Sequence, residues 1–100
     1  MKVSEFLTEA RAELDAGWVQ GTWQNGGGDV CHEGACDRVA MRHLDQIPVA
    51  AAARAAIDAK AMEIYNEASG RIVNDMEGRT KQDMLDLYDK TIIGLEERGQ

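Results

Sequence analysis

The most constraining feature of the sequence is the stretch 17–36, GWVQGTWQNGGGDVCHEGAC, which separates two helix-forming regions. It contains both tryptophans, both cysteines and six of the ten glycines of the chain. Glycine adopts backbone conformations that a regular helix excludes, so this composition interrupts the helical pattern. A chain of 100 residues has room for one core, so the stretch must fold against the helices that flank it.

Four segments outside this stretch repeat apolar residues at three- and four-residue intervals, the spacing of an amphipathic helix. Pro48 suits the first turn of one segment, because the N–H that proline lacks is not needed there. Thr80 and Asp83 have the spacing of a capping box at the start of the last segment. The pattern predicts one mainly α domain over residues 1–100. Its predicted helices cover residues 4–16, 34–45, 48–68 and 80–97, with a connector over residues 69–79.

Residues 18–31 carry the composition of a β-hairpin. The segment from Trp18 to Trp23 is rich in strand-forming residues, residues 25–28 are a turn sequence, and residues 29–31 supply a short return strand. A two-stranded ribbon is only marginally stable alone, so we expect it to pack on the helices. The sequence therefore predicts a small α+β fold, a four-helix domain with a short β-hairpin between the first and second helices. A regular strand would place the two tryptophans on opposite faces, unless Gly21 forms a bulge.

The predicted helix over residues 34–45 has an apolar side that we expect to be buried. Cys36 and Val39 lie near the middle of this side, and Met41 and Leu44 widen it. Ile47 continues the same apolar pattern beyond the helix. The alanine-rich segment that follows indicates that another helix approaches it closely.

The net charge of −7 limits the classes of partner. Phosphate backbones favour a basic surface, so direct binding of nucleic acid is not expected. No apolar run approaches the roughly eighteen residues of a membrane span, and no secretory leader is recognisable, so we expect no membrane association. We therefore expect a cytoplasmic protein with free thiols and no cofactor.

Cys31, His32, Cys36 and His43 are the side chains best suited to chemistry. One hypothesis is a structural zinc site, because zinc prefers nitrogen and sulfur ligands and Cys36 and His43 share a helix face. The spacing argues against it, since no second closely spaced pair of ligands follows. Another hypothesis is a thiol hydrolase with Cys31 as nucleophile and His43 as base, favoured by the position of Cys31 before a helix start. Two ordinary buried thiols explain the pattern more simply.

Glu5, Glu9 and Glu13 recur every four residues and form an acidic stripe on the first predicted helix. Together with Trp18 and Trp23, they are the candidate binding surface, which combines a charged face with aromatic side chains. A solvated face explains the stripe more simply. The partner that suits such a surface is a protein, bound by a monomer or a homodimer.

Three short motifs occur in order along the chain: W-x-Q-G from Trp18, C-x-x-G-A from Cys31 and N-D-x-x-G-R-T from Asn74. On these motifs the chain resembles an uncharacterised family of small proteins from actinobacteria and their phages. The resemblance spans about residues 17–92. Val73 and Cys36 depart from it, because the family usually has tryptophan and an aliphatic residue there. The resemblance implies an intracellular accessory protein and carries no catalytic role over to any residue.

We therefore expect a small, acidic, non-enzymatic interaction protein that binds a host or phage protein. The first alternative is a Cys31-centred site, either zinc bound with Cys36 and His43 or a thiol hydrolase. A further alternative is a DNA mimic whose acidic stripes occupy a nucleic-acid-binding protein.

Overall fold

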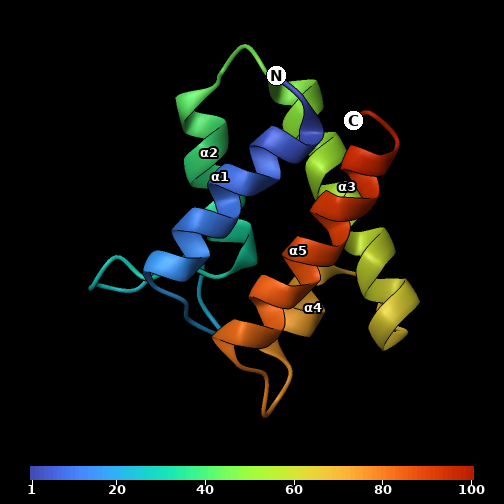
Figure 1. The fold of residues 1–100 in the computed structure, drawn as a ribbon. Coiled ribbons are helices and arrows are strands. Elements are labelled where there is room, and N and C mark those ends of the chain that lie inside the picture. The colour runs from blue at the N-terminus through green and yellow to red at the C-terminus, as the bar shows by residue number, and fades with distance from the viewer.

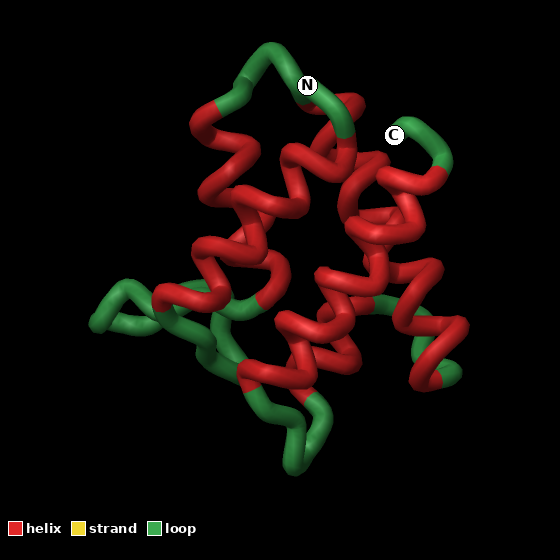
Figure 2. Tube along the Cα trace, viewed as in Figure 1, coloured by secondary structure: helices red, strands yellow, loops and turns green.

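The computed structural model describes residues 1–100 as five helices joined by loops (Figures 1 and 2). The mainly α class is confirmed, with one short helix more than the four predicted. No helix combines the length and the apolar character needed to cross a bilayer. The helices are α1 (Val3–Ala16), α2 (His32–Arg42), α3 (Ile47–Tyr65), α4 (Gly70–Asp75) and α5 (Lys81–Glu97).

Helix α1 lies at the centre of the packing and contacts α2, α3 and α5. Its buried residues Phe6, Ala10 and Leu14 follow one another at four-residue steps, so they form one continuous apolar face. Ile57 of α3 and Tyr88 of α5 are equally buried. Each large side chain removed from water in this way contributes roughly 1.5–3 kcal/mol. Both ends of the chain meet at one end of the molecule (Figure 1), where the Ser4 amide donates to the Gln100 carbonyl.

The predicted β-hairpin is wrong, because residues 17–31 form an irregular loop with two isolated bridges and no strand. Val30 forms a bridge with each of two segments. Its N–H donates to the Gly17 carbonyl and its carbonyl accepts from the Val19 amide, whereas on the other side the neighbouring Cys31 amide donates to the Trp23 carbonyl. Gly21 adopts a positive φ of 77°, which turns the chain in the middle of the predicted first strand. The run is therefore divided into two pieces, which pass on either side of Val30 instead of pairing along one ribbon.

Several predicted boundaries also change. Helix α2 begins at His32, directly after Cys31, and ends at Arg42 instead of residue 45. Helix α3 ends at Tyr65, because Asn66 takes the left-handed conformation that stops a helix. The predicted connector contains α4, capped by the Ser69 hydroxyl. The capping box of Thr80 and Asp83 at the start of α5 is confirmed.

Met41 and Leu44 are exposed, so the prediction that they widen a buried side is wrong. Met41 follows the buried Val39 by two residues and therefore points about 200° away around the helix. Leu44 lies beyond the end of α2, in the loop to α3, and Ile47 starts α3 with its side chain in solvent.

Candidate functional site

The first candidate site is a polar cluster inside the core, formed by His32, Cys36 and Tyr88. These side chains are fully buried and come from α2 and α5. His32 Nδ1 lies 2.5 Å from the Tyr88 hydroxyl, and Cys36 Sγ lies 3.4 Å from the same hydroxyl. His32 and Cys36 are four residues apart, so the first two turns of α2 place both beside Tyr88.

Burial keeps all three groups neutral at physiological pH. It lowers the pKa of His32 to about 4 and raises the pKa of Cys36 to about 11. It also raises the pKa of Tyr88 well above its usual value. The imidazole is neutral, but the adjacent Cys36 thiol stays protonated and so does not form the reactive thiolate. No solvent reaches the cluster. The arrangement is therefore better suited to specifying the core than to nucleophilic catalysis.

The far nitrogen of His32 has no hydrogen-bond partner. The nearest carboxylate oxygen, on Glu33, is 3.8 Å away and too distant for a hydrogen bond. Gly70 lies against the ring, and a Cβ at that position would come within 3.0 Å of this nitrogen. That Cβ would come still closer, 2.5 Å, to Cγ2 of Ile57 on α3, so glycine is required for α4 to pack this closely on both helices.

Asn74 organises the wall beside this cluster. Its Oδ1 accepts from the Trp18 indole at 2.8 Å and from the His32 amide at 3.0 Å. Its amide nitrogen donates to the Val19 carbonyl and to the Asp75 carboxylate. All four hydrogen-bonding positions of this buried side chain are thus used. One residue of α4 fixes both the start of the loop 17–31 and the start of α2.

Cys31 is the N-cap of α2, so the prediction that it directly precedes a helix is confirmed. Its sulfur accepts from the Gly34 amide at 3.5 Å, and burial is the main cause that raises the pKa of its thiol. His43, the proposed base, is at the other end of α2, twelve residues or about 18 Å further along the axis. The structure therefore does not bring the proposed nucleophile and base together.

The proposed zinc ligands are separated in the same way. Cys36 and His43 are seven residues apart, or about 10 Å along α2, and His43 Nε2 instead lies 3.0 Å from Glu9. The structure contains no group of three or more His, Cys, Asp or Glu side chains that could hold a metal ion. Cys36 and His32 are close to each other, but the third group beside them is the Tyr88 hydroxyl and not another His, Cys, Asp or Glu side chain.

Two of the three carboxylates in the acidic stripe of α1 pair with the end of α2. Arg42 bonds to both Glu9 and Glu13, and Arg38 lies 3.8 Å from Glu13. The Glu5 carboxylate accepts from the backbone amide of Lys2 and so serves the start of the helix. The ion pairs neutralise Glu9 and Glu13 within the chain, whereas Glu5 is exposed and makes no ion pair.

The two tryptophans have different environments. Trp18 is partly buried and packs against the core, with its indole N–H bonded to Asn74. Trp23 is 52% exposed, although its carbonyl anchors the amide of Cys31. Of the two, only Trp23 is available to a partner.

Sequence reasoning missed a group of exposed apolar residues around the turn between α2 and α3. Met41, Leu44 and Ile47 are 70%, 65% and 66% exposed. Met1 lies beside them, because its amine donates to the Gln46 side chain in the same turn. We call Met1, Met41, Leu44 and Ile47 the α2–α3 corner. The angle between Met41 and Val39 on a helical wheel was the signal that could have revealed it.

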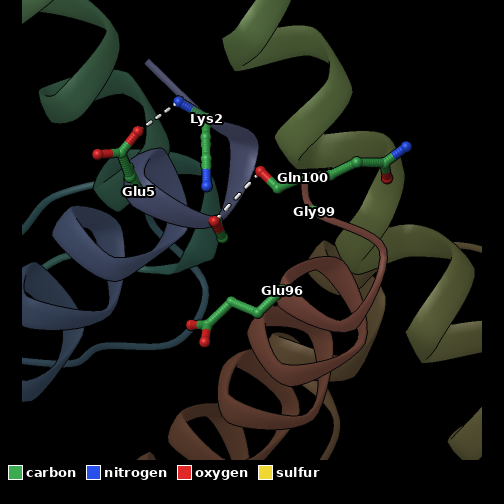
Figure 3. A pocket seen from close by; sticks show the side chains of 6 residues that line it. Lys2, Glu5, Glu96, Gly99 and Gln100 are labelled. Carbon is green, nitrogen blue, oxygen red and sulfur yellow. Dashed lines mark hydrogen bonds between the residues drawn. The ribbon is translucent and has the colours of Figure 1, made fainter.

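A hollow of about 400 Å³ lies where the two ends of the chain meet (Figure 3). No hydrophobic residue lines it, and its lining includes Lys2, Glu5, Glu96 and Gln100. Ligand sites are usually mostly apolar with a few placed polar groups, so this hollow lacks their character.

One comparison with known proteins gives a match. The chain matches DUF6197, described as a family of unknown function, over residues 1–93. No curated protein and no solved structure matches. Because the match covers nearly the whole chain, the protein belongs to the family DUF6197.

Proposed function

We propose that this protein is a non-enzymatic interaction protein whose α2–α3 corner binds an apolar segment of another protein. The observation that carries the proposal is the exposure of Met41, Leu44 and Ile47 within seven residues of sequence. Single exposed apolar residues are ordinary on protein surfaces, whereas a contiguous group indicates a contact site.

The composition of the corner suits a peptide or helix of varied sequence. Met1 and Met41 have flexible, polarisable side chains that adapt to different apolar shapes. Arg42, Asp45 and Gln46 lie between the apolar residues in sequence and supply a polar rim. An apolar centre with a polar rim is the usual anatomy of a protein interface.

The interior supports a non-enzymatic role. The residues with catalytic chemistry are either buried and neutral, as in the His32 cluster, or bound within the molecule, as in the pair of His43 and Glu9. The proposed partner is a host or phage protein, and the proposed location is the cytoplasm of an actinobacterial cell. Both follow the resemblance of the sequence motifs.

Trp23 defines a second candidate surface at the opposite end of α2. An exposed tryptophan is the residue type most enriched among interface hot spots. The DNA-mimic alternative has less support, because Arg38, Arg42 and His43 already pair with the stripe that would imitate phosphates.

The test compares capture of partners by tagged variants in cells that carry the native gene. Met41→Ser, Leu44→Ser and Ile47→Ser are combined in one chain, and captured proteins are quantified by mass spectrometry. We expect the specific partner to fall at least tenfold relative to the wild type, and titration with the purified partner should reproduce the loss.

Ile72→Ser is the matched control, because Ile72 is also an exposed isoleucine but lies on α4, away from the corner. It should retain the partner. Retention by the triple variant would refute the corner as the binding surface, and loss on Trp23→Ala alone would favour the Trp23 loop.

A further inference from the structure

The exposed face near the end of α5 has a pattern that neither the fold nor the α2–α3 corner uses. Lys90 is three residues from Ile93 and four from Gly94, and Glu97 is four residues from Ile93 and three from Gly94, so the four lie on one side of the helix. Ile93 is 57% exposed. Together with residues of α3, this side of α5 lines a hollow of about 300 Å³.

Gly94 has no explanation within the chain. A glycine inside a helix is less favourable than alanine, yet a Cβ here would meet only the Arg98 side chain, at an ordinary contact distance of 3.6 Å. The missing side chain instead opens the surface: a second hollow, of about 160 Å³, also borders Gly94. Gly94 is half-buried, and a small residue at such a position lets another helix approach closely.

Two opposite charges on this face have no partner within the chain. Lys90 and Glu97 take part in no ion pair or side-chain hydrogen bond, whereas Lys60 and Glu63 across the hollow pair with each other at 2.9 Å. Lys90 and Glu97 are equally distant in sequence from a point between Ile93 and Gly94. An antiparallel copy of α5 placed about that point would set Lys90 opposite Glu97 twice.

We propose that two copies of the chain associate through α5, about a two-fold axis that passes between Ile93 and Gly94. Ile93 of each copy then packs over Gly94 of the other, and Lys90 of each copy pairs with Glu97 of the other. A face that complements itself in shape and charge is the requirement for a two-fold interface. This inference stands apart from the proposed function, because the α2–α3 corner contributes no residue to it.

The interface is small, so dissociation constants of the order of tens of micromolar are expected. Sedimentation equilibrium between about 5 and 500 μM should show a monomer–dimer equilibrium for the wild type. Lys90→Glu and Glu97→Lys should each weaken it at least tenfold, because like charges then face one another at both contacts.

Mixing these two variants gives the decisive result. The Lys90→Glu chain carries glutamate at both positions 90 and 97, and the Glu97→Lys chain carries lysine at both. The two should form a mixed dimer at least as tightly as the wild type dimerises, and native mass spectrometry distinguishes this mixed dimer from the two homodimers by mass. Glu96→Lys is the control for Glu97→Lys, and Arg71→Glu for Lys90→Glu: both alter exposed residues away from this face and should leave dimerisation unchanged. Circular dichroism checks that every variant is folded. A wild type that stays monomeric at 500 μM, or a mixture that forms no mixed dimer, would overturn the proposal.

Discussion

The two ends of helix α2 show opposite arrangements of polar and apolar groups. At the N-terminal end, His32, Cys36 and Asn74 are buried and joined by hydrogen bonds to Trp18 and Tyr88. At the C-terminal end, the α2–α3 corner leaves apolar side chains in solvent. Polar groups inside and apolar groups outside are both exceptions to the usual distribution, and each exception needs its own explanation.

The difference separates what specifies the fold from what is free to bind. The N-terminal end joins the loop 17–31 to α2, α4 and α5 through directional bonds, so one altered residue affects several elements. At the C-terminal end, the side chains of Met41, Leu44 and Ile47 lie largely in solvent, so replacing them should change stability little. Substitutions at the two ends of α2 should therefore differ strongly in their effect on stability.

Asn74→Ala should destabilise the protein by about 3–4 kcal/mol. It leaves the Trp18 indole, the His32 amide and the Val19 carbonyl without their partner, and unsatisfied buried groups cost about 1–3 kcal/mol each. Urea denaturation measures the change. Asn66→Gly is the control: Asn66 has a φ of 56°, which glycine adopts readily, so its effect should stay within about 0.5 kcal/mol. A loss below about 1 kcal/mol for Asn74→Ala would show that the network is not structural.

Acidification should destabilise the protein through His32. The folded pKa is about 4 and the unfolded value about 6.5, so between these values the unfolded state binds the extra proton. Stability from this residue is therefore complete above pH 6.5 and falls by about 3 kcal/mol as the pH drops to 4. His32→Gln should flatten that part of the curve of stability against pH, whereas His43→Gln should retain it. A pH dependence unchanged by His32→Gln would contradict the buried, neutral imidazole.

Gly34→Ala should destabilise by about 2–3 kcal/mol, because a Cβ there would overlap the backbone carbonyl of Trp23, which cannot move aside easily. Gly94→Ala has no such obstacle and should stabilise the monomer by about 0.5–1 kcal/mol. Thermal unfolding at low micromolar concentration separates the two. Equal effects of the two substitutions would mean that the close packing of the loop on α2 contributes nothing to the stability of the fold.

Leu44→Ser should have the smallest effect, a change in unfolding free energy within about 0.5 kcal/mol. Exposed side chains already contact water, so little burial is lost. Val39 is five residues earlier and fully buried, so Val39→Ser should lower the free energy of unfolding several times more. A large loss of stability for Leu44→Ser would place the residue in the core and remove the case for a binding corner.

The sequence predicts the parts of this fold that depend on neighbouring residues. The amphipathic spacing locates α1, α3 and α5 to within a few residues, and the Thr80–Asp83 capping box is a contact over three residues. Cys31 stands at the start of α2 as expected, because its N-cap bond is equally local.

The rest depends on distant partners that no local pattern specifies. The path of residues 17–31 is fixed by Asn74, which is 56 residues from Trp18, and by bonds of Val30 and Cys31 to the separate segments at Gly17 and Trp23. Strand-like composition therefore gave the wrong structure. The Tyr88 hydroxyl that occupies the His32–Cys36 cluster comes from a helix 56 residues away, so the pattern of thiols and imidazoles alone indicated metal binding or catalysis.

The most direct test of the central contrast is photo-crosslinking in cells that carry the native gene. Benzoylphenylalanine replaces Leu44 at the corner, Trp23 at the other end of α2, or Ile72 on α4. We expect a discrete adduct with the partner protein from Leu44 and none from Ile72. No adduct from Leu44, or the same adducts from all three positions, would contradict this expectation.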